Sequence, residues 1–456
     1  MLIKYTFDNK VYQFTREDER VDGQNVFTIL VGKNGTGKSR LLSGIVNETL
    51  GGSSSVRSFD KRTITQYSGI VSEKLSYNQR PEKVVAISTS PFDKFPIPQR
   101  NSRIAGYSYL GLRDLPSENF GLAYLSKIAF ELLSSVKNNL EQMNEIGGIL
   151  NYLNYKNQIV LRFEGAMPKR FFDSLTKLDD VENGFKEAFD GAMLSPFRLN
   201  RRFFLDQNNK INREKLLKLR EILLAHDFMF LRRKTEILLN HNGLNIGLEY
   251  FEPNDFLFLF QAGFLILKGV DLTQGVGDKV FSISDASSGE QCVVLSLLGI
   301  ASQITNNALI CIDEPEICLH PEWQERYMGI LISTFKNYRN CHFIIATHSP
   351  QIISNLASSN CYILSIENRK IINADSVNHN SIDFQLASVF KAPGFKNEYL
   401  SRIALQTFAR VSRNKRFESD DLMHLEVLEN ISQYLKDNDP IGLVISSLVK
   451  LRKLYA

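Results

Sequence analysis

The sequence has little of several features that would narrow its class at once. Five cysteines occur in 456 residues, and none has the close C-x-x-C spacing of a zinc or redox site. The most apolar stretch, residues 256–270, contains Gln261 and Lys268 and is shorter than the roughly 20 residues of a membrane helix. The formal net charge is only +4, which neither requires nor excludes nucleic acid as a partner. We therefore expect a reduced, cytoplasmic, soluble protein with no membrane partner.

One segment carries a strong positive signal. The run G-K-N-G-T-G-K-S at 32–39 follows an apolar stretch, 26–31, and precedes a helix-like stretch, 40–46. This pattern between a strand and a helix predicts a phosphate-binding loop, because glycines let backbone N–H groups surround an anion at the positive end of a helix. The predicted nucleotide-binding residues are Gly32, Asn34, Gly35, Thr36, Gly37, Lys38 and Ser39. Lys38 would reach the β- and γ-phosphates, and the Ser39 hydroxyl would ligate Mg²⁺.

Two further strand ends carry polar residues. The apolar run 309–312 ends in Asp313 and Glu314, and the run 343–346 leads to His348. Asp313 fits a residue that holds Mg²⁺ directly or through water, and Glu314 is then placed to polarise the attacking water. His348 is a candidate sensor of the γ-phosphate, although a lone histidine is more often structural.

A segment rich in small residues, 284–291, precedes another helix-like stretch. Ser287, Ser288, Gly289 and Glu290 could form an anion-binding nest at the start of that helix. Without further context, the residues favour a helix cap by Ser287 or Ser288, with Gln291 completing a capping box. The residues alone leave both interpretations open.

The order of these four motifs resembles that of the ABC-type ATPases. The S-S-G-E form at 287–290 and the D-E-P-E-x-x-L-H-P form at 313–321 are similar to the branch that holds SMC, RecF and OLD proteins. The resemblance implies an α/β fold, with ATP and Mg²⁺ as cofactors. It implies catalytic roles for Glu314 and His348, and Mg²⁺ ligation by Ser39 and Asp313. The Q-loop glutamine of the family is not evident, although Gln99 lies near the expected region.

The resemblance also implies self-association. Two subunits would pair head to tail, as a dimer or within a higher oligomer. Ser287, Ser288, Gly289 and Glu290 of one subunit would then cap the γ-phosphate held by Lys38 of the other. This arrangement makes the second subunit part of each nucleotide site.

The resemblance implies an ABC-ATPase head, and the wide spacing between Lys38 and Ser287 predicts that a helical block is inserted into it. Apolar residues at helical spacing predict a helical C-terminal tail. The predicted parts are 1–115 (head with phosphate loop), 116–252 (helical insertion), 253–375 (rest of the head) and 376–456 (helices for oligomer or partner contacts). Within the insertion, apolar residues at helical spacing predict one helix from 122 to 143, ended by Gly147 and Gly148. They predict a second helix from 213 to about 239.

The chain shows no H-N-H nuclease motif and no Ser/His/Asp arrangement. Its compact plan resembles the stand-alone ATPase subunits of bacterial anti-phage systems, with the PtuA type of Septu first and the AriA type of PARIS second. That resemblance implies an ATPase that scaffolds and regulates a separate nuclease effector, an HNH nuclease of the PtuB type as first choice. The alternative is a RecF- or SMC-like ATPase that acts directly on DNA in repair, and a transporter subunit is the weakest interpretation.

Overall fold

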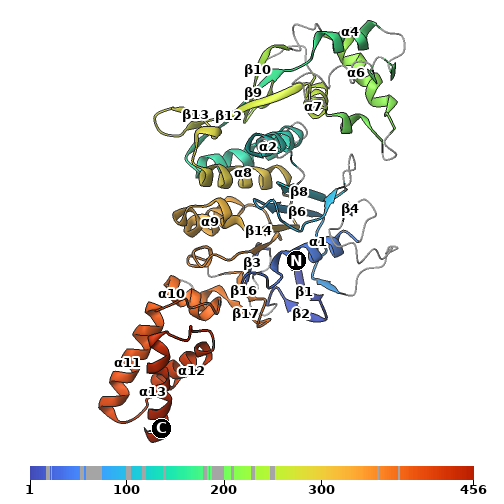
Figure 1. Cartoon of the computed structure of the whole chain (residues 1–456). Helices are drawn as coiled ribbons and strands as arrows, with labels where there is room; N and C mark the ends of the chain where they lie inside the picture. The colour runs from blue at the N-terminus through green and yellow to red at the C-terminus, as the bar shows by residue number, and fades with distance from the viewer. Residues whose placement is uncertain are drawn as a thin grey trace. The chain divides into compact units, whose positions relative to one another are not determined.

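The computed structural model describes residues 1–16, 21, 23–51, 56–57, 74–98, 104–113, 115, 120–136, 140–177, 182–183, 185–186, 200–206, 210–226, 232–246, 252–356, 359–377 and 381–455. The chain forms two compact units. In Figure 1 the colour follows the residue number from the N-terminus to the C-terminus. The first comprises Met1–Gly51, Gly69–Glu82 and Asn306–Ala456, and the second comprises Gly52–Ser68 and Lys83–Thr305. The first unit is therefore assembled from both ends of the sequence.

Parallel strands form the centre of the first unit. β14 (Ala308–Asp313) pairs with β15 (His342–Ala346), β15 pairs with β3 (Val26–Val31), and β3 pairs with β16 (Cys361–Ser365). Every residue of β3, β14 and β15 is buried. Continuous apolar runs are typical of parallel strands, because both faces of such a sheet are covered. β17 (Ile371–Asn373) adds to β16 in the antiparallel sense.

The remaining elements of this head surround the parallel strands. Helix α1 (Lys38–Thr49) contacts β14 and β15. The first 13 residues and a later segment form an antiparallel sheet of β2 (Lys10–Gln13), β1 (Leu2–Phe7) and β5 (Leu75–Tyr77). Helix α9 (Pro321–Thr334) joins β14 to β15, as a parallel connection requires.

The C-terminal part of the first unit is helical, as the sequence predicts. It contains α10 (Ile382–Phe384), α11 (Glu398–Asn414), α12 (Ser419–Ser432) and α13 (Pro440–Tyr455). These helices share a small core of their own, formed by Ala387, Leu400, Ile403, Ala404, Leu425, Leu428, Ile431, Ile441, Ile445 and Leu448. Pro440 begins α13, where its missing N–H costs no hydrogen bond.

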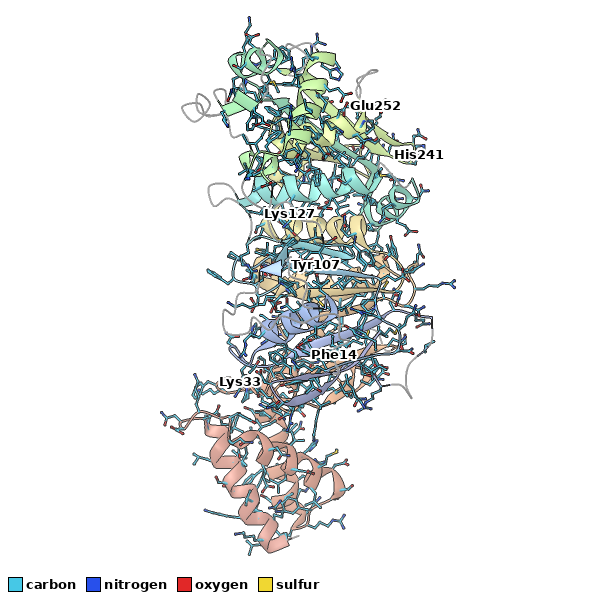
Figure 2. All side chains as sticks on the ribbon, turned by 90° about the vertical axis from the view of Figure 1, so that its right-hand side faces the viewer. Phe14, Lys33, Tyr107, Lys127, His241 and Glu252 are labelled. Carbon is cyan, nitrogen blue, oxygen red and sulfur yellow. The ribbon has the colours of Figure 1, made fainter. Side chains whose placement is uncertain are left out.

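The second unit contains helices and two kinds of strand pairing. β6 (Lys83–Ser88) pairs in parallel with β8 (Tyr107–Gly111), and β4 (Val56–Arg57) pairs with β7 (Ile97–Pro98). Its helices are α2 (Phe120–Val136), α3 (Leu140–Tyr152), α4 (Lys169–Lys177), α6 (Arg213–Ala225), α7 (Pro253–Ala262) and α8 (Ser288–Gln303). Lys127 of α2, labelled in Figure 2, donates to the Gly111 carbonyl at 3.1 Å and lies over the ring of Tyr109. These two contacts fasten α2 to β8.

The segment expected to be a helical block also contains strands. An antiparallel sheet runs in the order β11 (Gly243–Asn245), β10 (Lys234–Asn240), β9 (Tyr155–Gly165), β12 (Leu265–Gln274), β13 (Val280–Ser282). The buried residues of β9 follow a two-residue period at Ile159, Leu161 and Phe163, which suits one covered sheet face.

Two helix predictions in this segment were wrong in their bounds. The helix predicted for 213–239 ends at Ala225, and β10 occupies the end of that range. The residues predicted as one helix, 122–143, belong to two helices, α2 and α3, and α3 continues past Gly147 and Gly148 to Tyr152. A Cβ atom at Gly147 would collide with the side chain of Asn157, so this glycine permits close packing on the start of β9. Within the described residues, no helix has the length and apolar character to span a membrane.

Candidate nucleotide-binding site

The loop between β3 and α1 has the backbone that the glycine pattern predicts. Gly35 and Gly37 have φ angles of 79° and 97°, in the left-handed region that favours glycine. Gly37 is the N-cap of α1, and no side chain in the described part of the chain caps this helix start. The Thr36 hydroxyl and N–H both donate to the Lys33 carbonyl, at 2.9 and 3.3 Å, which closes the loop on itself. The helix end is thereby presented to an anion.

Lys38 is the cation of this loop. Only 3% of the residue is exposed. Its ammonium donates to the Gly32 carbonyl at 2.8 Å, to the Lys33 carbonyl at 3.1 Å and to His348 Nδ1 at 2.9 Å. Burial lowers the pKa of Lys38 to about 8, against the raising effect of nearby carboxylates led by Glu314. The group therefore remains mostly charged at pH 7.

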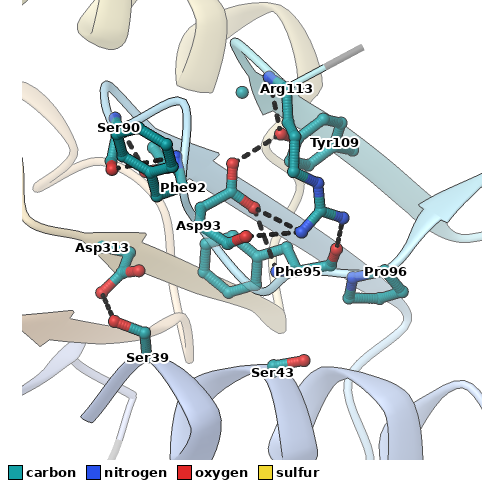
Figure 3. Close-up of polar contacts among 12 residues, drawn as sticks. Ser39, Ser43, Ser90, Phe92, Asp93, Phe95, Pro96, Tyr109, Arg113 and Asp313 are labelled. Carbon is teal, nitrogen blue, oxygen red and sulfur yellow. Dashed lines mark hydrogen bonds and ion pairs between the residues drawn. The ribbon is translucent and has the colours of Figure 1, made fainter. Parts of the chain in front are cut away.

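Ser39 and Asp313 lie together at the start of α1 and the end of β14. The Ser39 hydroxyl donates to Asp313 Oδ1 at 3.0 Å, as Figure 3 shows, and Asp313 is buried. Both are hard oxygen donors of the type that Mg²⁺ prefers. Among the described residues, no group of three or more His, Cys, Asp or Glu could hold a metal. Mg²⁺ often binds through one or two protein oxygens together with phosphate oxygens and water, and the Ser39–Asp313 pair offers such oxygens.

Glu314 and His348 form a side-chain hydrogen bond beside Lys38. His348 Nε2 lies 3.0 Å from Glu314 Oε1. The Lys38 ammonium can only donate, so Nδ1 of His348 accepts and Nε2 carries the proton given to Glu314. This hydrogen bond lowers the pKa of Glu314 and keeps the carboxylate ionised. Three residues from distant parts of the sequence thus form the chain Lys38–His348–Glu314.

The backbone at Glu314 is unusual. Its φ and ψ angles are 50° and 56°, which is left-handed and strained for a residue with a Cβ atom. Its N–H donates to the Ala346 carbonyl at 2.9 Å, so the neighbouring strand end holds this conformation in place. Such strain clusters at functional positions, because the surrounding structure must over-determine it.

Glu316 is a site residue to which the sequence analysis assigned no role. Its carboxylate accepts the backbone N–H of His348 at 2.5 Å, and burial raises its pKa. Its Oε2 atom has no hydrogen-bond partner among the described residues. Its place as the second glutamate of the D-E-P-E run at 313–316 was the sequence feature that could have pointed to this role. Glu316 anchors the main chain that carries His348.

The second unit carries the serine-glycine segment. Ser287 is the N-cap of α8, and its hydroxyl accepts the Glu290 N–H at 3.3 Å. The structure therefore contains the helix cap by a serine that the sequence analysis gave as one of two interpretations of this segment. Gln291 does not complete a capping box, because its amide donates to the carbonyls of Ser284 and Ala286, at 3.2 and 2.9 Å. A contribution of Ser287, Ser288, Gly289 and Glu290 to the site of a second subunit stays a prediction.

The loop after β6, also in the second unit, is held by one buried carboxylate. Asp93 accepts the Tyr109 hydroxyl at 2.7 Å and the Phe95 N–H at 3.0 Å, and Arg113 lies 3.7 Å away (Figure 3). Arg113 also donates to the carbonyls of Asp93 and Phe95, both at 2.5 Å. Gln99, the candidate Q-loop residue, lies outside the described residues.

The comparison with known families supplies the deciding observation. Residues 48–354 match the family described as "AAA domain, putative AbiEii toxin, Type IV TA system". This match spans more than half of the chain. The chain belongs to this AAA-domain family. The predicted α/β P-loop ATPase head with a helical C-terminal tail is confirmed.

Curated relatives of the AAA-domain chain come from retrons. It is 26% identical over 200 residues to the "Retron Ec83 probable ATPase" of Escherichia coli, covering 41% of this chain and 36% of the relative. It is 23% identical over 250 residues to the "Retron Vc95 probable ATPase" of Vibrio cholerae serotype O1 biovar El Tor, covering 47% of each. The chain thus spans less than half the length of these relatives.

The comparison with solved structures found similar chains at low sequence identity. One is the SmcHead bound to the C-winged helix domain of ScpA, at 15% identity, a TM-score of 0.27, and coverage of 81% of this chain and 95% of that one. A TM-score this low does not identify a fold. The fold assignment rests on the parallel strands and the loop between β3 and α1.

Proposed function

We propose that this chain is the ATP-hydrolysing subunit of a bacterial anti-phage defence complex, with a slow or regulated turnover. The observation that carries the proposal is the contact chain Lys38–His348–Glu314 beside the Ser39–Asp313 pair. These groups supply a cation, a base with its orienting partner, and two oxygen donors. The two relatives named as retron ATPases support the defence setting.

Each residue has a distinct task in ATP hydrolysis. Lys38 would bind the β- and γ-phosphate oxygens, since it is a buried ammonium at a helix start. Ser39 and Asp313 would hold Mg²⁺, which when bound neutralises phosphate charge. Glu314 would accept a proton from the attacking water, because its carboxylate is ionised. His348 would orient Glu314, and Glu316 would fix the backbone of His348.

Triphosphate binding must rearrange this set of contacts. The Lys38 ammonium already makes three hydrogen bonds, two of them to carbonyls of its own loop. A phosphate would replace at least some of these acceptors. Because His348 is one of them, its hold on Glu314 would respond to phosphate. We propose this exchange as the link between ATP occupancy and the catalytic carboxylate.

The partners are proposed from the resemblance to stand-alone defence ATPases. They are a second copy of this chain, paired head to tail, and a separate nuclease effector, first an HNH nuclease of the PtuB type. The helices α11–α13, with their own core, are candidates for either contact.

The test combines an activity and an association measurement. The purified chain should release phosphate from ATP, and Glu314→Gln should abolish this release while ATP still binds. The product of an adjacent gene should co-purify with the chain, and both genes together should lower phage plating. A chain that hydrolyses no ATP alone or with that product refutes the proposal. Steep salt-dependent binding to bare duplex DNA, with no co-purifying protein, would favour the repair alternative instead.

A further inference from the structure

The start of α8 is fastened to a residue from a different element. Glu290, in the first turn of α8, accepts the hydroxyl of Tyr155 at 2.6 Å through its carboxylate. Burial and the contact with Glu290 raise the pKa of Tyr155, so the phenol keeps its proton and donates. A hydrogen bond to a carboxylate is charge-assisted and belongs to the stronger class. The same Glu290 gives its backbone N–H to Ser287.

Tyr155 belongs to the antiparallel sheet of the second unit. It is the first residue of β9, the central strand of that sheet, and only 7% of it is exposed. Its ring lies 5.4 Å from that of Phe281, on the strand β13. The chain passes from β13 through a short 3₁₀ turn, Ile283–Asp285, directly to Ser287. The Tyr155 side chain therefore touches both the approach to the serine-glycine segment and its helix.

We infer that Tyr155 is a positioning residue that couples the antiparallel sheet to the serine-glycine segment. This inference rests on the proposed function, in which Ser287 completes the ATP site of a second subunit. By holding the Glu290 carboxylate, Tyr155 fixes the first turn of α8 and with it the Ser287 cap. A ligand or partner that moves the sheet would then change the geometry of the second subunit's ATP site without touching the phosphate loop.

The test removes one oxygen atom. Tyr155→Phe keeps the ring against Phe281 and loses only the hydrogen bond to Glu290. The kcat for ATP should fall about tenfold, the effect of about 1.4 kcal/mol on the barrier, while ATP affinity at the phosphate loop stays unchanged. Amide hydrogen exchange at 288–291 should become faster.

The matched control is another buried phenol of the same unit. Tyr107, labelled in Figure 2, donates its hydroxyl to the Pro96 carbonyl at 2.6 Å. Tyr107→Phe should leave both kcat and the exchange at 288–291 unchanged. In a double-mutant cycle, Tyr155→Phe with Glu290→Ala should lose no more activity than Glu290→Ala alone.

The outcomes separate this inference from the proposed function. Faster exchange at 288–291 with unchanged kcat would show that the contact is structural only, and would overturn the coupling. Additive losses in the cycle would overturn it as well. Absence of ATP turnover in the wild type would refute the proposed function and, with it, the coupling. The exchange measurement would then still decide whether Tyr155 orders the start of α8.

Discussion

Replacing Glu314 with glutamine should separate catalysis from stability. The amide keeps the size of the side chain, but it cannot take a proton from water. Its oxygen can still accept the hydrogen bond from His348 Nε2, which lies 3.0 Å from Glu314 Oε1 in the wild type. We expect turnover to fall at least ~100-fold, the usual scale for loss of a general base. This corresponds to about 2.7 kcal/mol on the activation free energy.

The cost to folding should be much smaller. A hydrogen bond to a charged acceptor contributes about 1 kcal/mol more than one to a neutral acceptor. The two side chains are 28% and 26% exposed, so solvent weakens the contact. Reducing the difference to about 0.5 kcal/mol for this exposure gives a Tm shift of about 1 °C in a chain of this size.

The assay is phosphate release at saturating ATP, with ATP affinity and Tm measured on the same preparation. Loss of turnover with unchanged affinity and Tm supports Glu314 as the base. Turnover within tenfold of the wild type would show that another residue activates the water. Loss of ATP affinity would place Glu314 in nucleotide binding instead.

Three further substitutions test other parts of the site. Lys38→Ala should abolish tight ATP binding, because the phosphates lose their buried cation; a dissociation constant within a few-fold of the wild type, by calorimetry, would contradict the phosphate-loop assignment. Ser287→Arg should block ATP hydrolysis but not ATP binding, and mixing it with Lys38→Ala should restore part of the activity in a phosphate-release assay, because one paired site is then intact. Full activity of Ser287→Arg alone would leave Ser287 as a helix cap only. Glu316→Gln should be more stable than the wild type at neutral pH: burial raises the pKa of Glu316, so the wild type loses stability as pH rises above 4.5, the ordinary pKa of the group. A difference in Tm that stays constant from pH 4 to pH 8 would refute that assignment.

The parallel core of the head could be predicted because its signals are local. β3, β14 and β15 are mostly apolar and fully buried, and the glycine pattern follows β3 directly. A fully buried strand and its loop need no knowledge of the rest of the chain. The same applies to α12 and α13, whose apolar spacing and Pro440 mark two separate helices.

The antiparallel sheet could not be predicted in the same way. In β10, Ile237 and Leu239 alternate, but they also continue the apolar spacing of the preceding helix α6. Only pairing with β9, whose partners Leu161 and Ile159 lie 76 and 80 residues earlier in the sequence, makes Ile237 and Leu239 part of a strand. The prediction that Gly147 ends a helix was wrong for a similar reason, because the role of this glycine depends on its packing against Asn157 of the strand β9.

Site residues could be predicted individually, but their contacts could not. Lys38, Glu314 and His348 were each identified from a strand or loop end. Their connection through the two ring nitrogens of His348 depends on tertiary structure. The role of Glu316 could not be predicted, because it depends on one hydrogen bond that its carboxylate accepts from the backbone N–H of His348.

The three acceptors around Lys38 affect the stability of the chain when no nucleotide is bound. A buried ammonium without partners would destabilise the fold and make it depend on ligand. Here the loop carbonyls and His348 satisfy that charge in advance. Folding therefore does not require ATP. The contribution of Lys38 to the free energy of ATP binding is the difference between its hydrogen bonds to phosphate and its present hydrogen bonds to the loop carbonyls and His348. Such an exchange limits affinity, so occupancy can follow the supply of nucleotide instead of being permanent.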